Sequence, residues 1–171
     1  IKIGTSLLRG SQEKSTIEMI NGYSDFLAKN IKKGERIILV TSGAVGLGSN
    51  QLGLQQRPFD VLSLQATAAI GQGHLMSLYK SAMQRHNILV AQILLTRSDL
   101  ESKQGYKNAS NTLKKLIDWG VMPIVNENDT VSQEELRFGD NDTLSALVAS
   151  AINADQLILL TDIDRIYSSD P

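Results

Sequence analysis

Residues Val121–Leu160, VMPIVNENDTVSQEELRFGDNDTLSALVASAINADQLILL, contain the clearest structural pattern in this chain. The apolar run Val121–Val125 at the start and the run Gln156–Leu160 at the end have the length and composition of core strands. Between them, Thr143–Ile152 is rich in alanine and is predicted to form a helix. Strands that alternate with helices are typical of an α/β fold whose mostly parallel sheet is covered on both faces.

The rest of the chain repeats this alternation. Ile1–Leu8 is prone to form a strand, and a polar loop leads from it to an amphipathic helix at about Thr16–Lys32. The remaining predicted elements are a strand at Arg36–Val40 with a helix after it, helical residues Phe59–His86 broken into two helices near Gly71–Gly73, a buried strand at Ile88–Leu95, and a helix at Asn108–Trp119. We therefore expect an open, mostly parallel sheet sandwiched by helices.

Composition limits the class of protein. With 171 residues, 42% of them hydrophobic, the chain is large enough for one domain with a sizeable core. The 17 basic and 18 acidic residues give a formal net charge of -1, so no overall field favours nucleic acid or an anionic membrane. The lack of cysteine excludes disulfides and cysteine catalysis and favours a cytoplasmic location. No apolar run reaches the roughly 18 residues that span a bilayer.

The polar stretch Asn126–Asp142 separates the strand from the helix described first. Its end clusters, NEND (Asn126–Asp129) and GDND (Gly139–Asp142), fall where a strand is predicted to end and a helix to begin. Ligands of open α/β sheets usually bind at such places. Asp140, Asn141 or Asp142 would also serve as a helix N-cap, but one cap does not need three polar residues, so we favour a site. Thr130–Phe138, between the clusters, is compatible with a small hairpin.

Two other segments offer binding sites for anions. Lys2 precedes Gly4, Thr5 and Ser6, so a strand that carries a cation enters a turn whose backbone N–H groups can approach a phosphate closely. The sequence from Thr41 to Ala44 places Ser42 and Gly43 at a predicted helix N-terminus, where unpaired N–H groups favour negative charge. An ordinary edge lysine and a serine N-cap without a ligand are the simpler alternatives for these two segments.

These groups favour phosphoryl transfer as the chemistry of the site. The chain has no GxxxxGK[ST] loop, no GxGxxG fingerprint and no HExxH motif, and its two histidines suggest no catalytic triad. A lysine, two turns rich in N–H groups and several carboxylates can position and neutralise a phosphoryl group, with carboxylates holding Mg²⁺ or orienting lysines. A carboxylate nucleophile, with a free pKa of about 4.3, would already be ionised and would need no general base.

Eight segments in order match a known pattern: KIGTS, VTSGAVGLG, LQATAAIGQG, QILLTRSDL, NTL, PIVNENDTV, FGDNDTLSALVA and LLTDIDRIYSSDP. Over essentially its whole length the chain resembles the amino acid kinase family, and TSGAVGLG, NENDTV and FGDND resemble the members that act on glutamate. The resemblance implies the open α/β sandwich of that family over residues 1–171. It also implies ATP-dependent phosphorylation of the γ-carboxylate of L-glutamate, with Mg²⁺, as the first step of proline biosynthesis.

The resemblance assigns roles to individual residues. Lys2 and Asp142 would be catalytic, Lys2 by stabilising charge on the transferred group and Asp142 by orienting a lysine and the metal. Substrate contacts would come from Ser42, Gly43, Asn126, Asp129 and Asn141. Nucleotide contacts would come from Lys2, Gly4, Thr5, Ser6, Thr161 and Asp162. No residue is assigned as a direct metal ligand.

The resemblance also sets out what lies outside this sequence. The second half of the family's domain carries a glycine-rich nucleotide loop and a second catalytic lysine, and neither is present before Pro171, so we expect the isolated fragment to be inactive. No PUA domain is present in these residues, although many members carry one. Family members are commonly homo-oligomers, dimers or tetramers, and are often inhibited by proline. Two alternatives stay open: a sibling kinase acting on N-acetylglutamate, aspartate, carbamate or a nucleoside monophosphate, and a noncatalytic amino acid sensor.

Overall fold

The computed structural model of the chain describes residues 1–10, 14–132 and 141–162. Its centre is a sheet whose strands are all parallel and lie in the order β3-β4-β2-β1-β5. The strands are β1 (Lys2–Ile3), β2 (Leu39–Thr41), β3 (Val90–Leu95), β4 (Met122–Glu127) and β5 (Leu159–Leu160). The predicted α/β class and parallel sheet are therefore confirmed.

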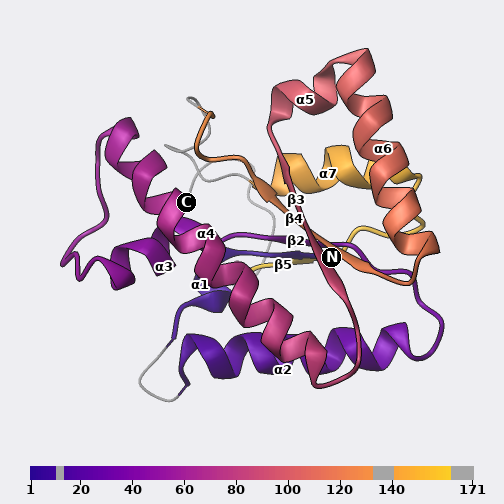
Figure 1. Cartoon of the computed structure of the whole chain (residues 1–171), viewed down its shortest axis with the longest axis horizontal. Helices are drawn as coiled ribbons and strands as arrows, with labels where there is room; N and C mark the ends of the chain where they lie inside the picture. Colours follow the sequence, from indigo (N-terminus) through magenta and orange to yellow (C-terminus); the bar gives the residue numbers. More distant parts are fainter. Residues whose placement is uncertain (11–13, 133–140, 163–171) are drawn as a thin grey trace.

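Helices cover both faces of this sheet, as predicted. They are α1 (Thr5–Leu8), α2 (Thr16–Ile31), α3 (Ala44–Gln51), α4 (Val61–Gln84), α5 (Arg97–Glu101), α6 (Lys103–Asp118) and α7 (Asn141–Ile152). Figure 1 shows α2 and α4 on one side of the strands and α6 with α7 on the other. It also shows α1 and α3, which follow β1 and β2, at the same end of the sheet.

Alternation along the strands produces two separate hydrophobic cores. Leu39 and Ile124 are buried in the core that includes α2 and α4, whereas their neighbours Val40 and Val125 are buried in the core that includes α6 and α7. Successive side chains of a strand point to opposite faces, so a run of buried apolar residues serves both cores at once. The same rule places Lys2 on the opposite face from Ile3, which packs in the core with α2 and α4.

The helix predicted to break near Gly71–Gly73 is a single helix, α4, from Val61 to Gln84. Gly71 is buried against α3, and a β-carbon there would overlap the carbonyl oxygen of Ala44. Gly48 of α3 is packed in the same way against the carbonyl of Thr67. These glycines allow two helix backbones to approach closely, so they serve packing and do not end a helix.

Other predicted boundaries also need correction. Ile1–Leu8 is not one strand, because β1 ends at Ile3 and Thr5–Leu8 is helical. The strand predicted as buried at Ile88–Leu95 is β3, an edge strand with partly exposed residues among those described. Asn141 and Asp142 lie within the first turn of α7, so neither is its N-cap. Asp140 and most of the suggested hairpin at Thr130–Phe138 lie outside the described residues.

Candidate active site

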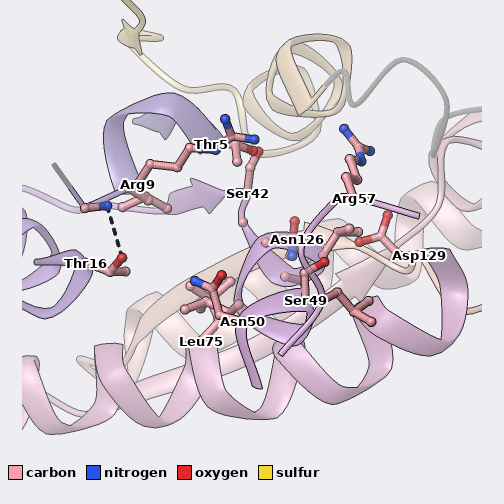
Figure 2. A pocket seen from close by; sticks show the side chains of 18 of the residues that line it. Thr5, Arg9, Thr16, Ser42, Ser49, Asn50, Arg57, Leu75, Asn126 and Asp129 are labelled. Carbon is pink, nitrogen blue, oxygen red and sulfur yellow. Dashed lines mark hydrogen bonds between the residues drawn. The ribbon is translucent and has the colours of Figure 1, made fainter. Parts of the chain in front are cut away.

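A cleft of about 430 Å³ lies at the carboxyl end of the sheet. Segments that follow β1, β2 and β4 line it together with the first turn of α3 and the first residue of α7. Six of the predicted site residues line this cleft: Thr5, Ser42, Gly43, Asn126, Asp129 and Asn141. Figure 2 shows Ser42 and Asn126 near its middle, with Arg9 on one side and Arg57 and Asp129 on the other.

Lys2 and Asp142, the two predicted catalytic residues, form an ion pair. The Lys2 Nζ lies 2.6 Å from Oδ1 of Asp142. The Lys2 side chain is 11% exposed, whereas that of Asp142 is 52% exposed, so water reaches the carboxylate more easily than the ammonium. Strand alternation explains the pairing, because Lys2 faces the side of the sheet on which α7 lies and Asp142 is in the first turn of that helix.

Gly4 lies directly beside the Lys2 ammonium group. A β-carbon at Gly4 would lie 3.3 Å from Lys2 Nζ and 3.7 Å from the carbonyl oxygen of Leu160. Leu160 pairs with Ile3 in the sheet, so Thr161 and Asp162 follow β5 beside the turn at Gly4. Ser6, Thr161 and Asp162 are exposed. The residues predicted to bind the nucleotide therefore gather at one end of β1 and β5.

Gly43 starts α3 in a conformation that other residues adopt only with strain. Its φ is 103° and its ψ is 0°, in the left-handed region, and it is the N-cap of the helix. Among the described residues no side chain caps this end. The first N–H groups of α3 belong to residues that line the cleft, including Ala44, Val45 and Gly46, and such groups can bind a carboxylate.

The Asn141 side chain connects three parts of the site. Its Nδ2 donates to the carbonyl oxygen of Thr41 at 2.7 Å, to Oγ of Ser42 at 2.7 Å and to Oδ1 of Asn126 at 3.0 Å, so two of these acceptors share one of its two hydrogens. The side chain of Thr41 makes a second contact, because its Oγ1 lies 3.0 Å from the hydroxyl oxygen of Tyr79. Burial raises the pKa of Tyr79, so the hydroxyl stays protonated and holds the end of β2 in place.

Asn126, predicted to contact substrate, is 2% exposed and directs its amide mainly into the protein. Its Oδ1 accepts from Asn141 Nδ2 and also from the backbone N–H of Glu127 at 2.9 Å. Its Nδ2 donates to Oε1 of Gln72 at 2.8 Å. Asn126 thus lines the cleft, but most of its hydrogen-bonding capacity is directed to neighbouring side chains.

Three charged residues in the cleft wall were not predicted: Arg9, Arg57 and Glu127. Glu127 is the buried last residue of β4 and lies within the NEND cluster itself, so its position was a signal that could have identified it. Arg9 directly follows α1, and Arg57 lies between α3 and α4 in a segment with no regular pattern. The cleft therefore combines two guanidinium groups with the carboxylates of Glu127 and Asp129, which suits a ligand that carries both signs of charge.

The described residues contain no group of three or more His, Cys, Asp or Glu side chains that could form a metal centre of their own. Mg²⁺ usually binds through one or two carboxylates together with substrate phosphates, so a complete protein cage is not required. The half-exposed carboxylate of Asp142 beside the Gly4 turn fits that mode. In the same part of the chain, no helix is long and apolar enough to cross a membrane.

The chain was compared with known protein families and curated proteins. Residues 1–171 match the model of the amino acid kinase family. The chain is 67% identical over 171 residues to a glutamate 5-kinase of Prochlorococcus marinus (strain MIT 9313), covering 100% of this chain and 47% of that protein. It is 61% identical to a glutamate 5-kinase of Synechococcus sp. (strain CC9605), again covering 100% of this chain and 47% of that protein. The chain thus spans about half the length of these relatives.

Proposed function

The chain belongs to the amino acid kinase family, and from this membership we propose that the protein containing it phosphorylates the γ-carboxylate of L-glutamate. The products would be L-glutamyl 5-phosphate and ADP, in the first step of proline biosynthesis. The relatives named glutamate 5-kinase, at 58–67% identity over the whole chain, support this choice of substrate over N-acetylglutamate, aspartate or a nucleoside monophosphate.

The observation that carries the proposal is the position of the Lys2–Asp142 ion pair next to the Asn141–Ser42 contact. Asn141 and Asp142 are consecutive residues of α7. The first turn of this helix therefore contacts both the Lys2 ammonium group, through Asp142, and the cleft residue Ser42, through Asn141. A transferred phosphoryl group would pass between these two features. Lys2 would stabilise the negative charge that spreads over its oxygens, while Asp142 holds the ammonium in place.

The glutamate would lie in the cleft, with its ammonium near Asp129 and its carboxylates near hydrogen-bond donors. Ser42 and the first N–H groups of α3 beyond Gly43 suit a carboxylate. Asn126 and Asn141 would shape this end of the cleft. The γ-carboxylate is ionised at neutral pH, so it can attack phosphorus without a general base, and the protein has only to orient it.

ATP would bind at the end of β1 and β5, with its phosphates at the Gly4–Ser6 turn and near Lys2. Thr161 and Asp162, after β5, would contact the nucleotide. Asp142 and the nucleotide phosphates would hold Mg²⁺, which supplies charge neutralisation on the phosphate oxygens when bound. The chain spans about half the length of its relatives, so other parts of the full-length protein would also contribute to the nucleotide site.

The test is an acyl phosphate assay on the full-length protein with hydroxylamine as the trapping reagent. L-glutamate with ATP should give the hydroxamate, whereas N-acetylglutamate, aspartate and carbamate should give no trapped product, and nucleoside monophosphates should not be converted to diphosphates at the expense of ATP. Turnover of one of those acceptors in place of glutamate would contradict the proposal. Glutamate binding by calorimetry without any turnover would favour the sensor alternative.

Three further parts of the proposal concern regulation, assembly and location. Proline is proposed as a feedback inhibitor, which a titration of the same assay with proline tests. A homodimer or homotetramer is proposed, and light scattering on the full-length protein measures it. The cytoplasmic location predicted from the lack of cysteine stays a prediction.

A further inference from the structure

A chain of side-chain amides runs from the cleft to the edge of the sheet. It begins at Asn141 in α7, continues through Asn126 in β4 to Gln72 in α4, and ends at Gln92 in β3. Gln72 does not line the cleft, and neither the predicted site nor the family resemblance assigns it a role. Its hydrogen bond with Asn126 is 2.8 Å long, whereas the bond from its Nε2 to Oε1 of the exposed Gln92 is 3.3 Å long.

Two backbone groups determine which way the amides of Asn126 and Asn141 are turned. The N–H of Glu127 can only donate, so the atom of Asn126 that faces it must be the oxygen. The carbonyl of Thr41 can only accept, so the atom of Asn141 that faces it must be the nitrogen. These assignments agree with each other, because Asn141 Nδ2 then donates to Asn126 Oδ1.

The orientation of Asn141 determines what Ser42 can offer to a ligand. Asn141 Nδ2 donates to Ser42 Oγ, so the serine oxygen accepts in that contact and its hydroxyl hydrogen is directed elsewhere. Ser42 is a cleft residue. A carboxylate in the cleft is the kind of acceptor that this hydrogen would suit.

Because the Asn126 oxygen faces two donors, Glu127 N–H and Asn141 Nδ2, its NH₂ group faces the other way and needs an acceptor within the protein. Asn126 is 2% exposed, so water cannot easily serve, and Gln72 Oε1 is the acceptor that the structure provides. If that acceptor were lost, the buried Asn126 NH₂ group would have no acceptor, and the side chain could reach water only by moving toward the cleft, away from Glu127 N–H and Asn141 Nδ2.

The packing of α4 fixes the position of Gln72. Its neighbour Gly71 is pressed against the carbonyl of Ala44 at the start of α3, where no β-carbon would fit. The same turn of α4 therefore supports the α3 N-terminus through Gly71 and the amide chain through Gln72. Both connections lead to the part of the cleft formed by Ser42, Gly43 and Asn141.

We propose that Gln72 is a positioning residue for the acceptor substrate, which holds the Asn126 side chain in contact with Asn141 so that Ser42 can donate to a carboxylate of the ligand. This inference rests on the proposed function for the identity of that ligand, L-glutamate. Gln72 itself touches neither the glutamate nor the nucleotide. Its effect should therefore fall on glutamate binding and leave the nucleotide half of the reaction unchanged.

The test compares Gln72→Leu with Gln72→Glu in the full-length protein. Gln72→Leu removes the acceptor and should raise the KM for glutamate about tenfold, while the KM for ATP stays within about twofold. Gln72→Glu keeps an oxygen in the same place and should restore the KM for glutamate to within about threefold of the wild type. Gln84→Leu, at the exposed end of the same helix, is the matched control and should change neither constant.

Melting temperatures measured on the same samples separate folding from positioning. If Gln72→Leu does not fold, Gln72→Met, which keeps a flexible side chain of similar length, replaces it. A wild type without glutamate-dependent turnover would contradict the proposed function. A wild type that turns over glutamate, with a folded Gln72→Leu or Gln72→Met variant of unchanged KM, would contradict the positioning role alone. So would a loss that Gln72→Glu does not restore.

Discussion

Lys2 and Asp142 form an ion pair of 2.6 Å that joins the first strand of the sheet to the first turn of α7. The lysine is nearly buried and the aspartate is half exposed. An ammonium group held in this way loses little freedom when a phosphoryl group arrives, because one partner already orients it. The pair therefore links the position of α7 directly to the chemistry proposed for Lys2.

Replacing Lys2 should affect the rate of transfer more than the binding of either substrate. We expect Lys2→Met to lower kcat by about a hundredfold or more, because the charge that develops on the phosphoryl group loses its counter-ion. Asp142→Asn should lower kcat less, by about tenfold, since the lysine remains but is less well oriented. Steady-state kinetics on the full-length protein measure both, with the exposed Lys29→Met as control. A Lys2→Met enzyme that kept wild-type kcat would rule out the assigned role.

Asp129 should act on glutamate and not on ATP. Asp129→Asn removes the negative charge expected to pair with the substrate ammonium, so the KM for glutamate should rise about tenfold or more. The KM for ATP should stay within about twofold, because the nucleotide is expected at β1 and β5. Asp118→Asn, on the exposed end of α6, provides the matched control. A change confined to the KM for ATP would be incompatible with the role assigned to Asp129.

Gly71 and Gly73 lie on the same helix and should respond oppositely to alanine. A β-carbon at Gly71 would overlap the backbone of α3, whereas one at Gly73 would meet nothing within 4 Å. We expect Gly71→Ala to lower stability by about 2 kcal/mol or more, and Gly73→Ala to raise it by about 0.5–1 kcal/mol. Thermal melting compares the two variants. Equal melting temperatures would mean that α3 and α4 do not pack as described.

The free energy of unfolding should fall at alkaline pH because the Tyr79 hydroxyl is buried. Burial raises its pKa in the folded protein, so the stability linked to its neutral hydroxyl is complete below the unfolded-state pKa of about 10. That stability should be lost as the pH rises above this value. The melting temperature, measured between about pH 8 and about pH 11, should fall more steeply with pH for the wild type than for Tyr79→Phe. Tyr106→Phe serves as the control, and parallel curves for wild type and Tyr79→Phe would contradict the expected linkage.

The fold was largely predictable because strand patterns depend on local sequence. The apolar runs at Val121–Val125 and Ile88–Leu95 predicted β4 and β3 to within a few residues. Only β4 is buried along its whole length, as a continuous apolar run predicts, whereas β3 lies at the edge of the sheet. The prediction of a break near Gly71–Gly73 was wrong for a tertiary reason. Glycine weakens an isolated helix, but here the backbone of α3 occupies the space beside Gly71.

The sequence motifs predicted several residues that line one cleft, but not the single side chains that reach it from irregular segments. Ser42, Asn126, Asp129 and Asn141 do line one cleft, as the positions of their strand ends suggested. Arg9 and Arg57 line it too, but long side chains from a turn and a loop carry no periodic signal. The contact between Gln72 and Asn126 could not be predicted from the sequence either, because it depends on the distance between α4 and β4 in the folded protein.

We propose that the γ-carboxylate of glutamate is the nucleophile, and that the protein positions it and does not deprotonate it. The most direct measurement uses L-glutamate labelled with ¹⁸O in its γ-carboxylate, ATP, the full-length protein and hydroxylamine. Attack of the carboxylate oxygen on phosphorus makes that oxygen the bridge of the acyl phosphate, and hydroxylamine then attacks the carbonyl carbon and releases phosphate. We expect the released phosphate to carry one ¹⁸O from glutamate, as measured by mass spectrometry. Phosphate that forms in a glutamate-dependent reaction without the label would contradict the claim.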